Sequence, residues 1–129
     1  MPHLAIEYSA GLEARADMKA VCAEAHRAMI ASGIFPLAGI RVRAHRADYA
    51  IVADGLPEND FAALTLSAGA GRSTEALKHA GGMIFAAVQA ALSDPLSTPH
   101  FGLSLEIRVI DPELSWKDTP IHVRLSGQS

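Results

Sequence analysis

The sequence predicts an α+β fold in which the order strand–helix–strand occurs twice. Apolar residues alternate with a period of two in four segments and recur at spacings of three and four in two longer ones, as in strands and helices. The two halves, about 1–60 and 61–125, share this order without evident residue identity. Because crossovers between parallel strands are right-handed, each half predicts a parallel βαβ unit, and both units fit one sheet with both helices on one face.

The first half is expected to contain a strand at 2–9, a turn at Ala10-Gly11, a helix from Asp17 to Gly33 and a strand at 39–47. The Asp17 carboxylate suits the N-cap of a helix, and Gly33 suits the left-handed position that follows the last turn. The apolar face of the first strand would consist of Leu4, Ile6 and Tyr8, and the apolar stripe of the helix would consist of Met18, Val21, Cys22, Ala25 and Met29.

The second half predicts a strand at 61–69, a helix that is capped by Ser73 and runs to about residue 92, and a strand at 101–110. Gly81 and Gly82 lie inside this helix, where each glycine costs about 1 kcal/mol relative to alanine. We therefore expect the helix to pack closely on the sheet at these positions. The tail, 115–125, shows one further short apolar alternation, which predicts a strand that pairs with a neighbouring subunit.

Composition limits the classes of function. The chain has 129 residues and a mass of 13.6 kDa, is 50% hydrophobic, and carries a net charge of −3, which fits a single domain over 1–129. The acidic balance argues against a nucleic-acid or membrane partner, and no apolar run approaches the roughly 20 residues that cross a bilayer. A single cysteine and the lack of an export signal lead us to expect a cytoplasmic protein.

Pro2 allows two interpretations. Proline suits the first position of a strand, because it cannot donate a hydrogen bond to the ladder. Removal of Met1 would instead turn the Pro2 nitrogen into a secondary amine, a base that no side chain supplies. A free α-amino group has a pKa of about 8, and an apolar pocket or nearby cations lower that pKa towards neutral pH. The position therefore fits both a structural proline and a catalytic base.

Arginines form the second candidate feature. Arg72 lies in "GAGRSTE", where a glycine-containing turn enters a helix, so its guanidinium and the helix N-terminus would together suit a carboxylate. The alternative is a solvated arginine beside an ordinary Ser73 cap. Arg41 and Arg43 share one strand face with His45, and this face is either exposed to solvent or forms a carboxylate clamp in a cleft.

No metal or cofactor motif is found in the sequence. The six histidines are scattered without HxH, HExxH or Cys/His spacing. Cys22 lies on the apolar stripe of the first helix, so we expect a small core residue rather than a nucleophile. The stretch "AGAGRST" lacks the Gly-Lys-Ser/Thr ending of a phosphate loop, and GxSxG and GxGxxG are absent. We therefore expect no metal and no organic cofactor.

Three stretches together resemble a known family. They are "MPH" at the start, "GIFPLAGIR" at 33–41 and "GAGRS" at 69–73. With the two strand–helix–strand units, they make the chain similar to the tautomerase superfamily and, more narrowly, to the 5-carboxymethyl-2-hydroxymuconate Δ-isomerase family. The resemblance spans nearly the whole chain. It implies a tautomerase-like α+β fold, with a four-stranded mixed sheet and two helices on one face.

The resemblance also implies a site and a reaction. Pro2 stands where the family has its N-terminal proline base, and Arg41 and Arg72 stand where the family has arginines that bind the substrate carboxylates. The implied reaction converts an enol, muconate-type polycarboxylate to its keto isomer during homoprotocatechuate degradation. Family members are similar in being homotrimers, with active sites near subunit interfaces and no metal or organic cofactor.

Two other functions fit the same residues. One is a different tautomerase-superfamily reaction, such as decarboxylation or dehalogenation of a small unsaturated acid, which only a panel of substrates would distinguish. The other is a non-catalytic trimer that binds small acids. Intact-mass measurement bears on this second alternative, because a retained Met1 makes the Pro2 nitrogen a non-basic amide.

Overall fold

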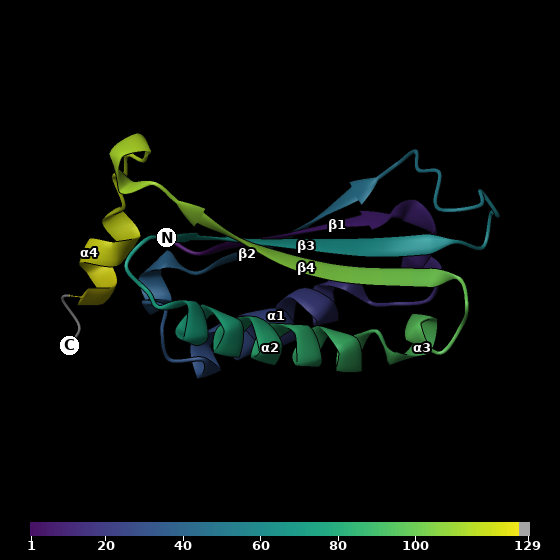
Figure 1. Ribbon diagram of the computed structural model, residues 1–129, viewed down its shortest axis with the longest axis horizontal. Coiled ribbons are helices and arrows are strands. Elements are labelled where there is room, and N and C mark those ends of the chain that lie inside the picture. Colours follow the sequence, from purple (N-terminus) through teal and green to yellow (C-terminus); the bar gives the residue numbers. More distant parts are fainter. Residues whose placement is uncertain (127–129) are drawn as a thin grey trace.

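A computed structural model describes residues 1–126, in which four strands form one sheet with helices against it (Figure 1). The strands are β1 (His3–Ser9), β2 (Arg41–Ala47), β3 (Asp60–Gly69) and β4 (Phe101–Ile110). Their order in the sheet is β2-β1-β3-β4. β1 pairs in parallel with β2 and β3 in parallel with β4, whereas β1 and β3 are antiparallel. The sheet is therefore mixed, and the predicted pair of parallel βαβ units is confirmed.

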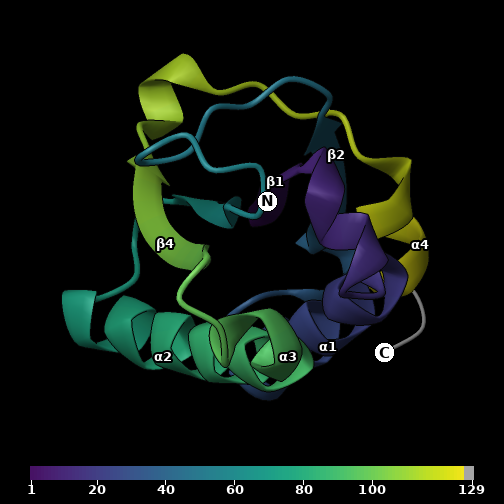
Figure 2. The same cartoon turned by 90° about the vertical axis from the view of Figure 1, so that its right-hand side faces the viewer.

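Two long helices, α1 (Met18–Ala31) and α2 (Thr74–Ala91), lie side by side on the same face of the sheet (Figures 1 and 2). The Asp17 carboxylate accepts hydrogen bonds from two N–H groups in the first turn of α1, and the Ser73 hydroxyl accepts one in the first turn of α2. Both predicted N-caps are confirmed. Gly33 has a φ of +76°, which fits the left-handed position predicted just after α1.

Shorter helical segments connect these elements. They are η1 (Ala10–Ala14), η2 (Leu37–Gly39), α3 (Ser93–Leu96), η3 (Pro112–Leu114) and α4 (Pro120–Ser126). The chain turns at Ala10-Gly11 as predicted, but the turn extends into the five-residue 3-10 segment η1, which buries Leu12 completely in the core. No helix in the described part of the chain is long and apolar enough to span a bilayer.

The tail is helical where a strand was predicted, so the prediction for 115–125 is wrong. Ile121, Val123 and Leu125 alternate along the sequence, but Ile121 and Leu125 are also four residues apart, which places them on one face of a helix. Pro120 is the first residue of α4, a position where the missing N–H of proline has no helical partner to lose. The short apolar pattern therefore fits the period of a strand as well as that of a helix. In the structure the segment is helical, and α4 packs against η2 (Figure 1).

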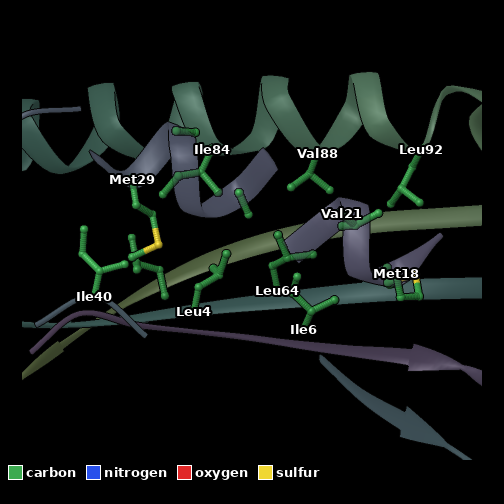
Figure 3. Packing of buried hydrophobic residues seen from close by; sticks show 14 of the residues in the cluster. Leu4, Ile6, Met18, Val21, Met29, Ile40, Leu64, Ile84, Val88 and Leu92 are labelled. Atoms are coloured by element: carbon green, nitrogen blue, oxygen red, sulfur yellow. The ribbon is translucent and has the colours of Figure 1, made fainter. Parts of the chain in front are cut away.

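The core lies between the sheet and the two long helices. Figure 3 shows Leu4 and Ile6 of β1 pointing towards the helices, with Ile84 and Val88 of α2 opposite them. All four side chains are almost completely buried. The alternation predicted for β1 is confirmed, because Leu4, Ile6 and Tyr8 are buried while Glu7 on the opposite face is exposed.

The two glycines inside α2 have different surroundings. A Cβ added to Gly81 would lie 3.0 Å from Cδ1 of Ile107 in β4, which is closer than side chains normally approach. Gly81 therefore allows the close contact of helix and sheet that the sequence predicts. A Cβ added to Gly82 would meet nothing within 4 Å, so that part of the prediction is wrong.

Candidate functional site

The stretches 33–41 and 69–73 meet at the end of the sheet where the chain begins (Figure 1). Nε of Arg72 donates a hydrogen bond to the Ile34 carbonyl at 3.0 Å, and its Nη1 donates to the Gly69 carbonyl at 3.2 Å. The guanidinium lies over the ring of Phe35, 4.9 Å from the ring centroid. Arg72 is therefore half-buried and joins the two stretches, and it is not a freely solvated arginine beside a helix cap.

Arg41 begins β2, and its side chain turns back towards the start of the chain. Its backbone N–H donates to the Pro2 carbonyl at 3.0 Å, and its Nη1 donates to the carbonyls of Ala38 at 2.6 Å and Ile40 at 3.3 Å. Its Nη2 lies 3.7 Å from the Met1 sulfur. These contacts hold a second guanidinium beside the first two residues of the chain.

Pro2 is fully buried directly before β1. Gly39, the last residue of η2, lies against it. A Cβ added to Gly39 would lie 3.0 Å from Cδ of Pro2 and 3.4 Å from Cα of Met1. The glycine in "LAGIR" therefore permits the close approach of η2 to the start of the chain, and this contact helps to hold Pro2 in place.

Two cavities adjoin the start of the chain. The larger has a volume of about 360 Å³ and is lined by Met1, Pro2, Pro36, Ala38, Gly39, Gly69, Ala70, Arg72, Lys117, Thr119 and His122. The smaller has a volume of about 180 Å³ and is lined by Met1, His3, Gly69, Ala70, Ile110, Pro112, Ser115 and Lys117. The two cavities share four lining residues, so they are neighbours. No Asp or Glu of the described residues lines either cavity, so their lining suits an anion.

The amino group of Met1 lies among cations, which lower its pKa from 8.0 to about 6 together with burial. Burial is the largest cause, followed by the hydrogen bond and charge of Lys117 and then by the charges of Arg72 and Arg41. Burial and like charges both disfavour the protonated form of an amine. The Met1 amino group is therefore mainly uncharged at neutral pH.

The other polar residues on the Arg41 face of β2 have a different environment. Arg43 and His45 are exposed and line neither cavity. Nη1 of Arg43 lies 3.0 Å from Nδ1 of His3. Burial, followed by the charge of Arg43, lowers the pKa of His3. Arg41 therefore contacts Met1 and Pro2, whereas Arg43 contacts only the next residue, His3, and lines neither cavity.

Metal binding and thiol chemistry have no support in the described residues. Within residues 1–126, no three His, Cys, Asp or Glu side chains lie together as a metal site. Cys22 packs half-buried against the core, and burial raises the pKa of its thiol. A raised pKa keeps the thiol protonated, so Cys22 is not an activated nucleophile.

The structure adds cavity residues that the sequence did not indicate. Lys117 and Thr119 lie between η3 and α4, and His122 lies in α4. The tail matches no motif, and basic residues near the end of a chain are common on solvated surfaces. Nothing in the local pattern shows that this segment folds back over the first residue, so sequence analysis missed these three residues.

Comparisons with known proteins agree over nearly the whole chain. Residues 2–125 match the model of the family described as "CHMI: 5-carboxymethyl-2-hydroxymuconate isomerase". A 5-carboxymethyl-2-hydroxymuconate Δ-isomerase of Escherichia coli is 37% identical over 124 residues, which are 95% of this chain and 97% of the relative. The crystal structure of a 5-carboxymethyl-2-hydroxymuconate isomerase from Deinococcus radiodurans R1 is 34% identical with a TM-score of 0.88, and the match covers 96% and 93% of the two chains.

More distant solved structures share the fold. The "Q0 fused 4-OT wild type symmetric trimer" is 22% identical with a TM-score of 0.60, and the match covers 81% of this chain and 84% of that one. At this identity the likeness concerns the arrangement of strands and helices alone.

Proposed function

The chain belongs to the 5-carboxymethyl-2-hydroxymuconate isomerase family, and from this membership we propose that it converts the enol 5-carboxymethyl-2-hydroxymuconate to its keto isomer. One structural observation carries the proposal: the start of the chain, Arg41 and Arg72 lie together beside a cavity that no Asp or Glu of the described residues lines. The fold is that of the tautomerase superfamily. The reaction serves the degradation of homoprotocatechuate, an aromatic compound.

Pro2 acts as the base once Met1 has been removed. Its nitrogen is then a secondary amine beside the cations that help to lower the pKa of the Met1 amino group to about 6. The uncharged amine takes the proton from the enol hydroxyl, and a proton is returned to a carbon of the conjugated chain. A C=O forms where the enol was, and the double bonds shift along the chain. No electron or group leaves the substrate, so the reaction itself needs no redox cofactor.

Arg41 and Arg72 bind substrate carboxylates and stabilise the negative charge that develops on the enol oxygen. Each guanidinium is already held by backbone carbonyls, which are those of Ala38 and Ile40 for Arg41 and those of Ile34 and Gly69 for Arg72. A guanidinium has more N–H donors than these bonds use, so donors remain for a carboxylate. Because the two side chains are already oriented, little ordering is needed when the substrate binds.

The protein works as a homotrimer in the cytoplasm, on a small-molecule polycarboxylate and without nucleic acid, membrane, metal or organic cofactor. A symmetric trimer among the structures with the same fold supports the assembly. The single cysteine is typical of a reducing compartment.

A spectroscopic assay tests the function. Protein whose intact mass shows that Met1 is absent is mixed with 5-carboxymethyl-2-hydroxymuconate, and the loss of enol absorbance is followed over time. We expect rapid conversion, and we expect a matched preparation that retains Met1 to be inactive, because its Pro2 nitrogen is an amide. No conversion by the processed protein would overturn the function. Equal turnover by both preparations would instead leave the function standing and remove Pro2 as the base.

A further inference from the structure

Lys117 occupies a place that the two arginines do not. It lines both cavities at the start of the chain, whereas Arg72 lines the larger one only. Lys117 is the only Lys or Arg among the described residues that line the smaller cavity. No described carboxylate forms an ion pair with it. The smaller cavity therefore has one strong cationic group, and that group is not neutralised by the protein.

Among the described residues that line the smaller cavity with Lys117, the titratable groups are His3 and the Met1 amino group. His3 lines the smaller cavity, but burial and the charge of Arg43 lower its pKa, so His3 is mainly neutral at neutral pH. The terminal amino group itself is mainly uncharged there. An anion that enters the smaller cavity therefore meets Lys117 as its principal positive charge.

The proposed substrate has more carboxylates than the two arginines. A muconate carries a carboxylate at each end of its conjugated chain, and the carboxymethyl branch adds a third. Two guanidinium groups bind two carboxylates well in bidentate geometry, and a third carboxylate in a partly closed cavity needs a partner of its own. Arg72 lines the larger cavity and Arg41 lies beside Met1, so both arginines are available to the two ends of the muconate chain.

We propose that Lys117 binds the carboxylate of the carboxymethyl branch, in the smaller cavity, while Arg41 and Arg72 bind the two carboxylates of the muconate chain. This inference rests on the proposed function and makes Lys117 the residue that selects a branched tricarboxylate over an unbranched dicarboxylate. A lysine is suitable for this role, because its ammonium is a compact charge on a flexible stem that can follow a branch.

Binding of two unreactive ligands tests the inference. One is the saturated carbon skeleton of the substrate with its three carboxylates, and the other is hexanedioate, which lacks the branch. Neither contains an enol, so affinity is read without turnover. Calorimetry at neutral pH compares processed wild-type protein with Lys117→Gln, which removes the charge, and Lys117→Arg, which keeps it. Lys19→Gln is the matched control, because Lys19 is an exposed lysine on α1 that lines neither cavity.

We expect the wild type to bind the tricarboxylate about tenfold or more tightly than hexanedioate, as a charged hydrogen bond of ordinary strength would give. Lys117→Gln should lose most of this preference while its affinity for hexanedioate hardly changes. Lys117→Arg should keep most of it, and Lys19→Gln should behave as the wild type. With the enol substrate, Lys117→Gln should raise KM much more than it lowers kcat.

Three results would overturn the inference: a preference that survives Lys117→Gln, an equal loss of affinity for both ligands, or a wild type that shows no preference. A failure of the proposed function gives a different pattern. In that case the processed wild type binds the tricarboxylate through Lys117 but does not convert the enol.

Discussion

At the residue scale, the proposed chemistry depends on an amino group placed among cations. Lys117, Arg72 and Arg41 all act on the amino group of Met1, and no described Asp or Glu lines the cavities beside it. None of these residues is unusual by itself. Their combination makes a basic, uncharged amine at neutral pH, while the guanidinium groups stay available for an anion.

We predict that kcat/KM of the processed protein rises with pH through a single group. Burial and cations lower the pKa of the Met1 amino group, and the Pro2 amine of the processed protein would lie beside the same cations. Its protonated, inactive form should therefore prevail only below the usual pKa of an α-amino group. Activity should be lost as the pH falls through the pKa of the Pro2 amine and should be level above it. Lys117→Gln removes one cation and should shift the acid limb to higher pH. A rate that is flat throughout the acid range would contradict an amine base.

Arg72→Ala should raise KM for the polycarboxylate about tenfold or more, because a charge-assisted hydrogen bond to the substrate is lost. Arg72→Lys should restore this only in part, because a lysine cannot make both the Ile34 and the Gly69 contacts that orient the guanidinium. Steady-state kinetics measure both effects. Arg27→Ala, on the exposed side of α1, is the control for loss of one positive charge. Unchanged kinetics in Arg72→Ala would exclude Arg72 from the site.

At the element scale, local sequence signals and packing act together on α2. Ser73 begins the helix through its side-chain cap, and Gly81 lets the helix approach β4 where Ile107 leaves no room for a methyl group. Gly82 has no such neighbour. One glycine therefore serves the packing of helix on sheet, and the other only adds flexibility to the unfolded chain.

We expect Gly82→Ala to stabilise the protein by about 0.5–1 kcal/mol, the usual difference in helix propensity. Gly81→Ala should gain less or lose stability, because its Cβ would lie 3.0 Å from Cδ1 of Ile107 and that side chain would have to move. Urea unfolding of both variants measures the free energies. A larger gain in Gly81→Ala than in Gly82→Ala would show that close packing is not the reason for Gly81.

At the scale of the whole molecule, the isolated chain leaves apolar surface uncovered. Tyr49, Ile51 and Trp116 are 96%, 91% and 86% exposed. β2 and β4 are the edge strands of the sheet, and within residues 1–126 no further strand pairs with their outer backbone groups. Exposed apolar side chains and free strand edges are typical of surfaces that bind other chains. Both features favour the proposed homotrimer.

We predict that light scattering gives a mass of three times the 13.6 kDa chain mass at micromolar concentration. Trp116 is the single tryptophan, so its fluorescence reports on its surroundings. If the assembly covers it, its emission should lie at shorter wavelength than that of an exposed indole and should shift to longer wavelength on dilution. A mass of one chain, unchanged with concentration, would contradict the assembly.

The sequence by itself determined most of the elements and the three residues at the centre of the proposed site. Period-two and period-3.6 patterns act over a few residues, so β1, α1, β3, α2 and β4 follow from local physics, as do the caps at Asp17 and Ser73. Pro2, Arg41 and Arg72 were found through stretches similar to a known family. The structure brings these three residues to one end of the sheet.

Only the tertiary structure decided the order of the strands, the helical tail and the place of Lys117. The apolar pattern of the tail fits a strand and a helix equally, and contact with η2 goes with the helix. Lys117 is far from Met1 in the sequence, yet the two line the same cavities. Contacts between residues far apart in the sequence result from many weak interactions over the whole fold. A local pattern of residues therefore does not predict them.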